Sequence, residues 1–542
     1  YEKDARFWAE EGTPLDFGHE LLPDDLERIS DNVMRAMERL PALETAGIKR
    51  NINGPMIWSP DGAALFGPVP ELKNYFCCNG IIPGFSQSGG LGSQLAQWII
   101  EGEPEYDMFP WDMARYGHWA NKAFTKARTF DAYSHRFKIH FPFEEREAGR
   151  PIDGRKRPVY ERQKEKGAVF GLNYGWEHPL WYAPEGVSRI ETYGYERQDW
   201  WHHVGDECRA LRSAVGVIDI SNFAKYEIKG AGAFDWLNAF AANTIPTEVG
   251  RSCLTPLLGI RGGIAGDFTI TKLAEDHYFM VGSGMAERYH QRYFDAVPLP
   301  ADTSFTCLTE QLTGFNIAGP NARTLLARLT NEDMTNDAFK FMRSKLMTVA
   351  GLDARVLRVS FTGDLGFEVY VPQDQQLALY DALFEAGADL GVVPVGGRAL
   401  GSLRVEKGYG SWGREYSPEY WPQEVGLERL VKTDKGDFLG KSGFEAIKDK
   451  APRELLSILE IEVDQADATG GEPIFTTDGK PVGRVSTGAY GYSVEKSLAL
   501  GFIKKEHHQP GTEYHVYVLG QPHKATLLAE APFDPKGERL RG

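Results

Sequence analysis

Residues 449–542 alternate short apolar runs with turn residues, and this pattern limits the fold of the C-terminal part most strongly. The runs lie at residues 455–462, 473–475, 481–487, 498–503 and 513–519. Several short strands separated by turns at close spacing are typical of a small all-β domain. The pattern therefore predicts a small β-barrel or sandwich for residues 449–542.

Residues 186–448 carry both strand and helix patterns. The segments 215–220, 226–229, 254–258 and 268–272 are rich in apolar, aromatic or β-branched residues and predict strands. Residues 233–242 and 375–386 have the apolar spacing of helices. This mixture predicts an α+β domain.

Residues 1–117 combine an acidic helical stretch at 22–40 with predicted strands at 53–62 and 75–78. A glycine-rich segment at 80–92 predicts a turn, and the apolar spacing after it predicts a helix that ends near Gly102. A strand, a glycine-rich turn and a helix in this order bring backbone N–H groups against an electron-rich ligand group. Residues 118–185 are aromatic and charged, and we expect 144–166 to form a solvated connector.

Length and composition limit the organisation and the partners of the chain. At 542 residues it is too long for one core, and we predict domains at 1–117, 118–185, 186–448 and 449–542. A formal net charge of -16 argues against a nucleic-acid partner, which requires an excess of Lys and Arg. No stretch approaches 18 uninterrupted apolar residues, so we predict no membrane span.

Cysteine and histidine spacing predicts no metal site. The five cysteines form no C-x-x-C pair, and the adjacent Cys77 and Cys78 lie in a predicted buried strand. A reducing compartment fits this usage best. His202 and His203 have no further ligands at useful spacing, so we interpret them as structural.

A glycine-rich segment that ends at Asp267 is the first candidate for chemistry. Gly259, Gly262, Gly263 and Gly266 precede this aspartate, which then enters a β-branched strand. Such glycines allow the backbone to approach a ligand closely and leave the carboxylate unshielded. The alternative is a solvated Asp that leaves a hairpin turn, and spacing alone favours that alternative.

Glu368 is the second candidate. Alternation in the strand around it places Phe367 and Val369 on one face, with Glu368 and Tyr370 on the other. A carboxylate beside aromatic rings can accept two in-plane N–H bonds from an aminopyrimidine ring. The alternative is a surface strand with its polar face outward.

A third candidate segment, residues 397–415, contains Arg398, Arg404 and Glu406. These three charges are compatible with either a structural ion network or a binding site. Composition does not separate the two.

In their order along the chain, these segments resemble the aminomethyltransferase (glycine-cleavage T-protein) family over about residues 186–540. The resemblance rests on Gly216-Val-Ile-Asp-Ile-Ser221, Gly262-Gly-Ile-Ala-Gly-Asp267, Thr362-Gly-Asp-Leu-Gly-Phe-Glu368, Leu403-Arg-Val-Glu406, Glu424-Val-Gly-Leu427 and Phe438-Leu-Gly-Lys441. Upstream segments look like the end of the flavin domain and the connector of the dimethylglycine and sarcosine dehydrogenase (oxidase) family. These are Pro60-Asp-Gly62, Leu65-Phe-Gly-Pro68, Ser88-Gly-Gly-Leu-Gly92, Gly167-Ala-Val-Phe-Gly171 and Gly175-Trp-Glu-His-Pro179.

The resemblance implies an α+β multidomain fold. It consists of a partial FAD-dependent oxidoreductase (DAO-like) domain, a connector, a T-protein-like folate-binding domain and the C-terminal barrel. It also implies FAD and tetrahydrofolate as cofactors and an N-methyl amine, dimethylglycine or sarcosine, as substrate. The expected reaction is oxidative N-demethylation, in which tetrahydrofolate takes the one-carbon unit as 5,10-methylenetetrahydrofolate.

The resemblance also implies roles for particular residues. Asp267 would be the catalytic carboxylate, and Glu368 would hold the pterin ring. The remaining positions expected near a cofactor are Tyr409, Thr269 and Gly282 in the folate pocket, and Phe85, Ser86, Gln87 and Ser88 beside the flavin. Phe361 also belongs to this pocket, but it stands where the fused oxidases tend to carry Tyr, and Leu254 likewise replaces an aromatic residue.

No Gly-x-Gly-x-x-Gly turn after a predicted strand occurs in the sequence, although the family binds FAD with one. We therefore expect a flavin-binding segment, in the same or a companion polypeptide, as a partner, and an electron-acceptor protein as a further one. We expect a cytoplasmic location, or the mitochondrial matrix if the source is eukaryotic. Two alternatives stay open: a redox-inactive folate-dependent aminomethyltransferase or demethylase, and a non-catalytic folate-binding subunit of a larger oxidase.

Overall fold

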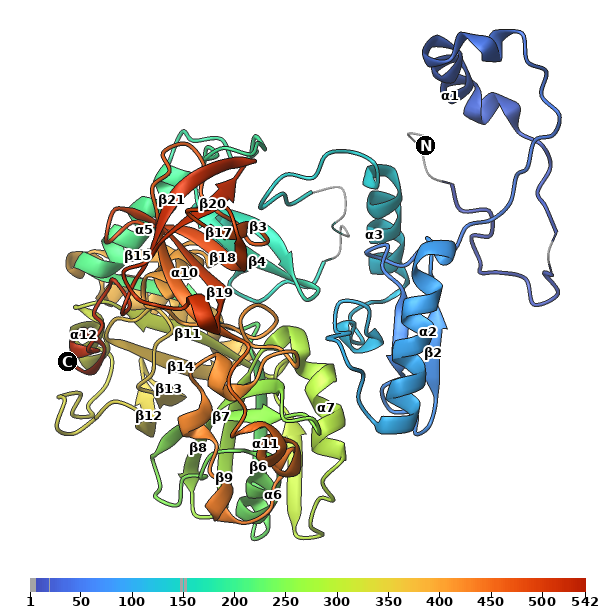
Figure 1. Cartoon of the computed structure of the whole chain (residues 1–542). Helices are drawn as coiled ribbons and strands as arrows, with labels where there is room; N and C mark the ends of the chain where they lie inside the picture. The colour runs from blue at the N-terminus through green and yellow to red at the C-terminus, as the bar shows by residue number, and fades with distance from the viewer. Residues whose placement is uncertain (1–5, 19, 147–149, 151–153) are drawn as a thin grey trace. The chain divides into compact units, whose positions relative to one another are not determined.

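The computed structural model describes residues 6–18, 20–146, 150 and 154–542. The chain divides into two compact units, coloured along the sequence in Figure 1. Unit 1 comprises Tyr1–Trp98, Met108–His140 and Arg146–Gly154, and unit 2 comprises Ile99–Asp107, Phe141–Glu145 and Arg155–Gly542.

In its described residues, unit 1 contains a small antiparallel sheet, two α-helices and most of a third, whose last turn belongs to unit 2. The sheet pairs β1 (Leu65–Pro68) with β2 (Phe76–Asn79), and the helices are α1 (Leu26–Arg39), α2 (Gly84–Glu101) and α3 (Lys122–His135). Phe66 on β1 packs with Leu91 and Trp98 of α2 in the core of the unit. The predicted helix at 22–40 and the predicted strand at 75–78 are confirmed as α1 and β2.

Two predictions for unit 1 are wrong. Residues 53–62 form no strand, because Pro55 and Pro60 interrupt the run of backbone N–H donors that a ladder needs. The glycine-rich segment 80–92 was predicted to be a turn, but from Gly84 onward it is helical, because α2 begins at this residue. Each glycine disfavours a helix by about 1 kcal/mol relative to Ala, but the packing of Leu91 and Trp98 against Phe66 outweighs this cost.

Unit 2 contains two sheets that carry the candidate residues. The five-stranded antiparallel sheet has the order β10-β6-β9-β8-β7. Its strands are β6 (Ala224–Gly230), β7 (Ser252–Leu258), β8 (Ile264–Ala274), β9 (His277–Gly282) and β10 (Thr303–Cys307). The six-stranded sheet has the order β12-β13-β14-β11-β5-β15, with β5 and β15 parallel. Its strands are β5 (Val215–Asp219), β11 (Leu312–Ala318), β12 (Ser344–Val349), β13 (Leu352–Leu357), β14 (Gly366–Pro372) and β15 (Val392–Val395).

The remaining helices and one hairpin of unit 2 complete these layers. The hairpin is formed by β3 (Ala168–Asn173) and β4 (Trp176–Tyr182). The helices are α4 (Tyr160–Glu165), α5 (Trp201–Ser213), α6 (Ala233–Phe240), α7 (Glu287–Asp295), α8 (Ala322–Ala327), α9 (Gln376–Ala386), α10 (Gly397–Glu406), α11 (Lys441–Ile447) and α12 (Glu538–Arg541). Arg157 and Gln163 are buried, so the prediction of a solvated connector at 144–166 is wrong for this part.

The C-terminal strands close into a barrel in the order β16-β19-β18-β17-β20-β21, drawn in orange and red in Figure 1. They are β16 (Glu454–Ile461), β17 (Pro473–Thr476), β18 (Pro481–Gly491), β19 (Lys496–Lys504), β20 (Glu513–Val518) and β21 (Gln521–Leu527). Leu459, Ile474 and Val516 are fully buried among its core residues. The predicted barrel and the α+β class are thus confirmed.

The segment Ile99–Asp107 belongs to unit 2 because it packs on the turn between β7 and β8. The backbone N–H of Arg261 donates to Oε2 of Glu103 at 3.1 Å, and its guanidinium donates to Oε2 of Glu101 at 2.5 Å. A Cβ atom at Gly259 would lie 2.1 Å from Oε1 of Glu103. A side chain at this position would therefore force the Glu103 carboxylate to shift away from the turn.

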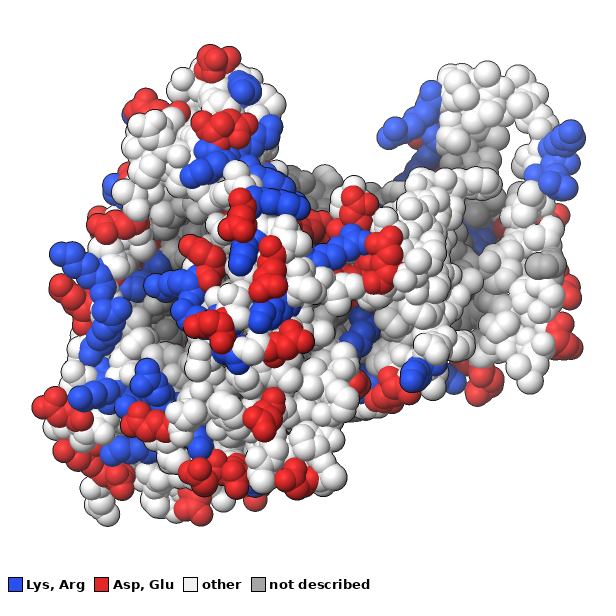
Figure 2. All heavy atoms as spheres, turned by 60° about the horizontal axis from the view of Figure 1, so that its bottom comes forward, with Lys and Arg blue, Asp and Glu red and all other residues white. Residues whose placement is uncertain are grey.

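The surface is charged and mixed in sign. Acidic and basic side chains are interspersed on the face shown in Figure 2. Among the described residues, no helix has both the length and the apolar character needed to cross a bilayer.

Candidate functional site

Asp267 lies near the start of β8, directly after the glycine-rich turn. Its side chain is half-buried, and burial raises the pKa of this carboxyl to about 6, opposed by a hydrogen bond from its own backbone N–H. No other described side chain donates to it. A carboxyl group with this pKa exchanges a proton readily near neutral pH.

Glu368 lies on β14, in register with Asn316 of β11 and Leu357 of β13. Its side chain is only 8% exposed, so the alternative of an outward-facing polar strand is wrong. The hydroxyl of Tyr370 donates to Oε2 at 2.7 Å. Burial raises the pKa of Glu368 to about 7, while the Tyr370 hydrogen bond and the positive charge of Lys225 oppose this rise.

Lys225 on β6 is a functional candidate that the sequence did not reveal. It is fully buried, and its Nζ donates to the backbone carbonyls of Ser221 at 2.8 Å and Phe223 at 2.6 Å. Burial lowers the pKa of Lys225 to about 7. Strand alternation alone gives no signal for it, because a lysine in a sheet is normally solvated.

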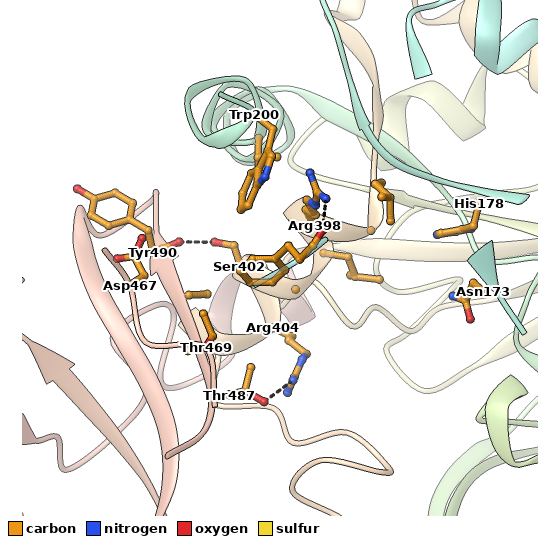
Figure 3. Close-up of a pocket in the computed structure, with 18 of the residues that line it drawn as sticks. Asn173, His178, Trp200, Arg398, Ser402, Arg404, Asp467, Thr469, Thr487 and Tyr490 are labelled. Carbon is orange, nitrogen blue, oxygen red and sulfur yellow. Dashed lines mark hydrogen bonds between the residues drawn. The ribbon is translucent and has the colours of Figure 1, made fainter. Parts of the chain in front are cut away.

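A cavity of about 450 Å³ lies in unit 2 among β4, α5, α10 and the barrel. Figure 3 shows Asn173 and His178 at one end and Asp467, Thr469 and Tyr490 at the other. The hydroxyl of Ser402 donates to the carbonyl of Tyr490 at 2.6 Å, and Arg404 donates to the Thr487 hydroxyl at 3.1 Å, which ties α10 to the barrel.

The charged residues of the third candidate segment are largely paired. Arg404 donates to Glu415 at 3.0 Å, and Arg212 donates to the fully buried Glu406 at 2.9 Å. Arg398 pairs with Glu191 and stacks on Trp200 at 4.5 Å. The segment is therefore an ion network, and its Arg398 and Arg404 also line the cavity.

His178 and Asp219 also line this cavity. Burial lowers the pKa of His178, and the charge of Asp219 opposes that shift. The sequence singled out neither residue as a candidate for a site. The adjacency of the two residues arises from the fold, since β5 and β4 are far apart in the chain.

The structure brings one pair of predicted site residues into contact and places two others on the neighbouring strands β8 and β9. Phe361 and Tyr409 stack with ring centroids 5.9 Å apart and an interplanar angle of 20°. Gly282 on β9 pairs with Phe268, and Thr269 pairs with Val281. The cavity in Figure 3 is lined by none of the residues predicted to hold folate, and that Asp267 and Glu368 face one shared space stays a prediction.

The residues predicted near the flavin lie in unit 1. Phe85, Ser86, Gln87 and Ser88 form the first turns of α2 and are exposed. They therefore lie on a helix, and the glycine-rich loop that the sequence predicted for them is absent.

Comparisons with known proteins agree with this architecture. Residues 159–435, just over half of the chain, match the GCVT N-terminal domain. Residues 455–534 match the glycine cleavage T-protein C-terminal barrel domain, and residues 101–153 match the FAD dependent oxidoreductase central domain. The fold resembles the crystal structure of glycine cleavage system aminomethyltransferase T from Bartonella henselae, with a TM-score of 0.61 and 23% identity over 70% of this chain and 98% of that one.

Several relatives match nearly the whole chain. Mitochondrial dimethylglycine dehydrogenase from Mus musculus is 34% identical over 96% of this chain and 60% of its own length. Mitochondrial sarcosine dehydrogenase from Homo sapiens is 31% identical over 100% of this chain and 64% of its own length. The chain thus spans about 60% of the length of these relatives.

The matched models define a glycine cleavage T-protein module preceded by part of an FAD dependent oxidoreductase central domain. The chain belongs to the glycine cleavage T-protein family. The resemblance to dimethylglycine and sarcosine dehydrogenases inferred from the motifs is confirmed.

Proposed function

We propose that the chain acts in flavin-dependent oxidative N-demethylation of a methylated glycine, dimethylglycine or sarcosine, and passes the one-carbon unit to tetrahydrofolate. The product would be 5,10-methylenetetrahydrofolate. The similarity to two dehydrogenases of methylated glycines over almost the whole chain supports the redox half of this proposal. The family of the larger module supports the transfer half.

The buried Glu368 carboxylate is the observation that carries the proposal. A reduced pterin presents two adjacent N–H donors in one plane, and a carboxylate accepts both as charge-assisted bonds. Tyr370 donates to Oε2, which keeps a second lone pair for a ligand, while Oε1 has no partner among the described residues. A buried carboxylate with an open acceptor atom fits a polar ligand, because an unsatisfied charge in this position is costly.

Asp267 is proposed to hold or accept a proton during transfer of the one-carbon unit. Its pKa of about 6 allows it to be ionised when the attacking folate nitrogen loses a proton and positive charge develops nearby. Thr269, Gly282, Phe361 and Tyr409 would line the pocket around it. Gly282 has no room for a side chain, since a Cβ atom there would lie 2.5 Å from the ring of Phe268.

FAD, when bound, supplies the acceptor for the hydride that leaves the N-methyl carbon. Phe85, Ser86, Gln87 and Ser88 are proposed to face it. The N–H groups of Ser86 and Gln87 already donate to the carbonyl of Pro83, so their contacts would come from the exposed side chains. This differs from a glycine-rich loop, which would bind through its backbone.

Anaerobic calorimetry with tetrahydrofolate tests the folate half on the chain itself. Glu368→Gln should weaken binding by about 10-fold or more, because it replaces a charge-assisted acceptor. Asp267→Asn should bind within about 3-fold of the wild type but lower one-carbon transfer by about 100-fold or more in protein loaded with flavin. Glu227→Gln, a change in a strand carboxylate paired with Arg355 and Lys229, is the control and should leave both unchanged.

The same experiment separates the alternatives. Absence of tetrahydrofolate binding by the wild-type chain would contradict the proposal. Binding and transfer without amine oxidation would indicate a redox-inactive aminomethyltransferase. Binding with no turnover in any variant would indicate a non-catalytic folate-binding subunit.

A further inference from the structure

The geometry points to His290 and Trp412 as the positioning residues of Asp267, acting through the backbone carbonyl of Ala265. This inference rests on the proposed function, because it assumes that Asp267 has a chemical task. It adds two residues from distant elements, α7 and the loop after α10, that the motifs around Asp267 do not contain.

Ala265 is the extra residue of a β-bulge. On β7, Leu257 pairs with Gly266 and Leu258 pairs with Ile264, so Ala265 has no partner there. On the other side, the pairing of β8 with β9 begins only at Phe268. Bulges of this kind change the direction of the following side chains and leave a backbone group unpaired.

Two buried side chains replace the missing strand partner. The indole Nε1 of Trp412 donates to the Ala265 carbonyl at 2.9 Å, and Nε2 of His290 lies 3.1 Å from the same oxygen. The exposed fraction is 5% for Trp412 and 0% for His290. A carbonyl oxygen has two lone pairs, so these two donors saturate it.

His290 acts here as a neutral donor. Burial lowers its pKa to about 3, so one ring nitrogen carries the only proton. The carbonyl accepts from Nε2, and Nδ1 has no hydrogen-bond partner among the described residues. A neutral ring also keeps positive charge away from Asp267, which is consistent with the raised pKa of that carboxyl.

The surrounding packing leaves this arrangement little freedom. A Cβ atom at Gly266 would lie 2.5 Å from Nε2 of His290, and one at Gly263 would lie 2.0 Å from the carbonyl of Pro418. The ring of His290 is held by Phe268 at 4.7 Å and Trp412 at 5.3 Å between centroids. The bulge is therefore clamped two residues before Asp267, which sets where its carboxylate points.

Removing the donors tests this inference. Trp412→Phe and His290→Leu each delete one N–H but keep an apolar side chain, whereas His290→Gln retains an N–H at similar reach. Trp236→Phe is the matched control, because its indole also donates to a backbone carbonyl, that of Val297, at 3.0 Å in the same module. The titration of Asp267 is followed by infrared spectroscopy without ligand. The carboxyl band of Asp267 is identified as the one that is lost when Asp267→Asn is added to each variant.

We expect the Asp267 midpoint near pH 6 to fall by about one pH unit or more in Trp412→Phe and His290→Leu, as the carboxylate becomes free to reach water. Hydrogen exchange of residues 262–268 should rise by about 10-fold or more, since a clamped backbone segment opens. His290→Gln and Trp236→Phe should match the wild type in both measurements. One-carbon transfer should fall with the midpoint, while tetrahydrofolate affinity at pH 8 stays within about 3-fold.

An unchanged midpoint and exchange rate in both Trp412→Phe and His290→Leu would overturn the inference. The infrared and exchange measurements need no folate, so they decide it even if the wild-type chain fails to bind tetrahydrofolate. That failure would contradict the proposed function alone. Faster exchange with an unchanged midpoint would show that the clamp supports the bulge without positioning Asp267, and would also count against the inference.

Discussion

The buried carboxyl of Glu368 ties the stability of the folded protein to pH. Its pKa is about 7 in the folded state and near the ordinary 4.5 when unfolded, so the folded state binds the proton more tightly. The free energy of unfolding contributed by this group therefore falls as the pH rises from 4.5 to 7. The variant Glu368→Gln lacks this titrating carboxyl group and therefore lacks its contribution to the pH dependence of stability.

We expect Glu368→Gln to be more stable than the wild type by on the order of 3 kcal/mol at pH 8 and nearly equal to it at pH 4. Urea unfolding at the two pH values measures this. The opposite sign at pH 8 would mean that ionised Glu368 is stabilised by its surroundings, including Lys225, more than burial penalises it. Weaker folate binding together with higher stability is the pattern expected of a binding residue.

At the residue scale, the sequence predicted Asp267 and Glu368 as the candidate acids but not their environment. The glycines before Asp267 are visible in the sequence, whereas the Ala265 bulge and its donors His290 and Trp412 depend on tertiary packing. The burial of Lys225 could not be predicted either. Its Nζ is solvated inside the protein by the carbonyl groups of Ser221 and Phe223, and these contacts form only in the folded chain.

At the scale of elements, the β8–β9 hairpin depends on the absence of a side chain at Gly282. In Gly282→Ala, the new Cβ would meet the ring of Phe268 at 2.5 Å, and overpacking of this kind costs about 1–3 kcal/mol. Gly401→Ala in α10 is the control, since nothing lies within 4 Å of its Cβ position, and it should stabilise the helix by about 0.5–1 kcal/mol. Thermal unfolding of both variants measures the contrast.

Helices and strands with a clear periodicity of apolar residues were predicted from the sequence, and strands whose apolar and polar residues are mixed were not. The segment 498–503 has a continuous apolar run and the segment 215–220 has one interrupted only by Asp219, and the structure has β19 and β5 there. Strand β21 was missed because Gln521-Pro-His-Lys-Ala-Thr-Leu527 begins with polar residues and lacks such a run. Its place in the sheet is set by its neighbours β20 and β16, which a single segment cannot reveal.

At the scale of the molecule, unit 2 includes the segment Ile99–Asp107, which is separated in the chain from the continuous part of the unit that begins at Arg155. Glu103→Ala removes the acceptor of the Arg261 N–H and should raise hydrogen exchange in residues 259–263. Glu101→Ala, which breaks a more exposed ion pair with the same arginine, should change stability by less than about 1 kcal/mol. Equal exchange in the two variants would contradict a special role for the buried carboxylate.

The packing of Ile99–Asp107 on the β7–β8 turn has a practical consequence for anyone who wishes to express the aminomethyltransferase-like part alone. A recombinant fragment that starts at Arg155, where the continuous part of unit 2 begins, would lose both Glu101 and Glu103. The backbone amide of Arg261 would then face water, six residues before Asp267. Such a fragment can retain the barrel and both sheets and still be a poor substitute for the intact polypeptide in assays of Asp267.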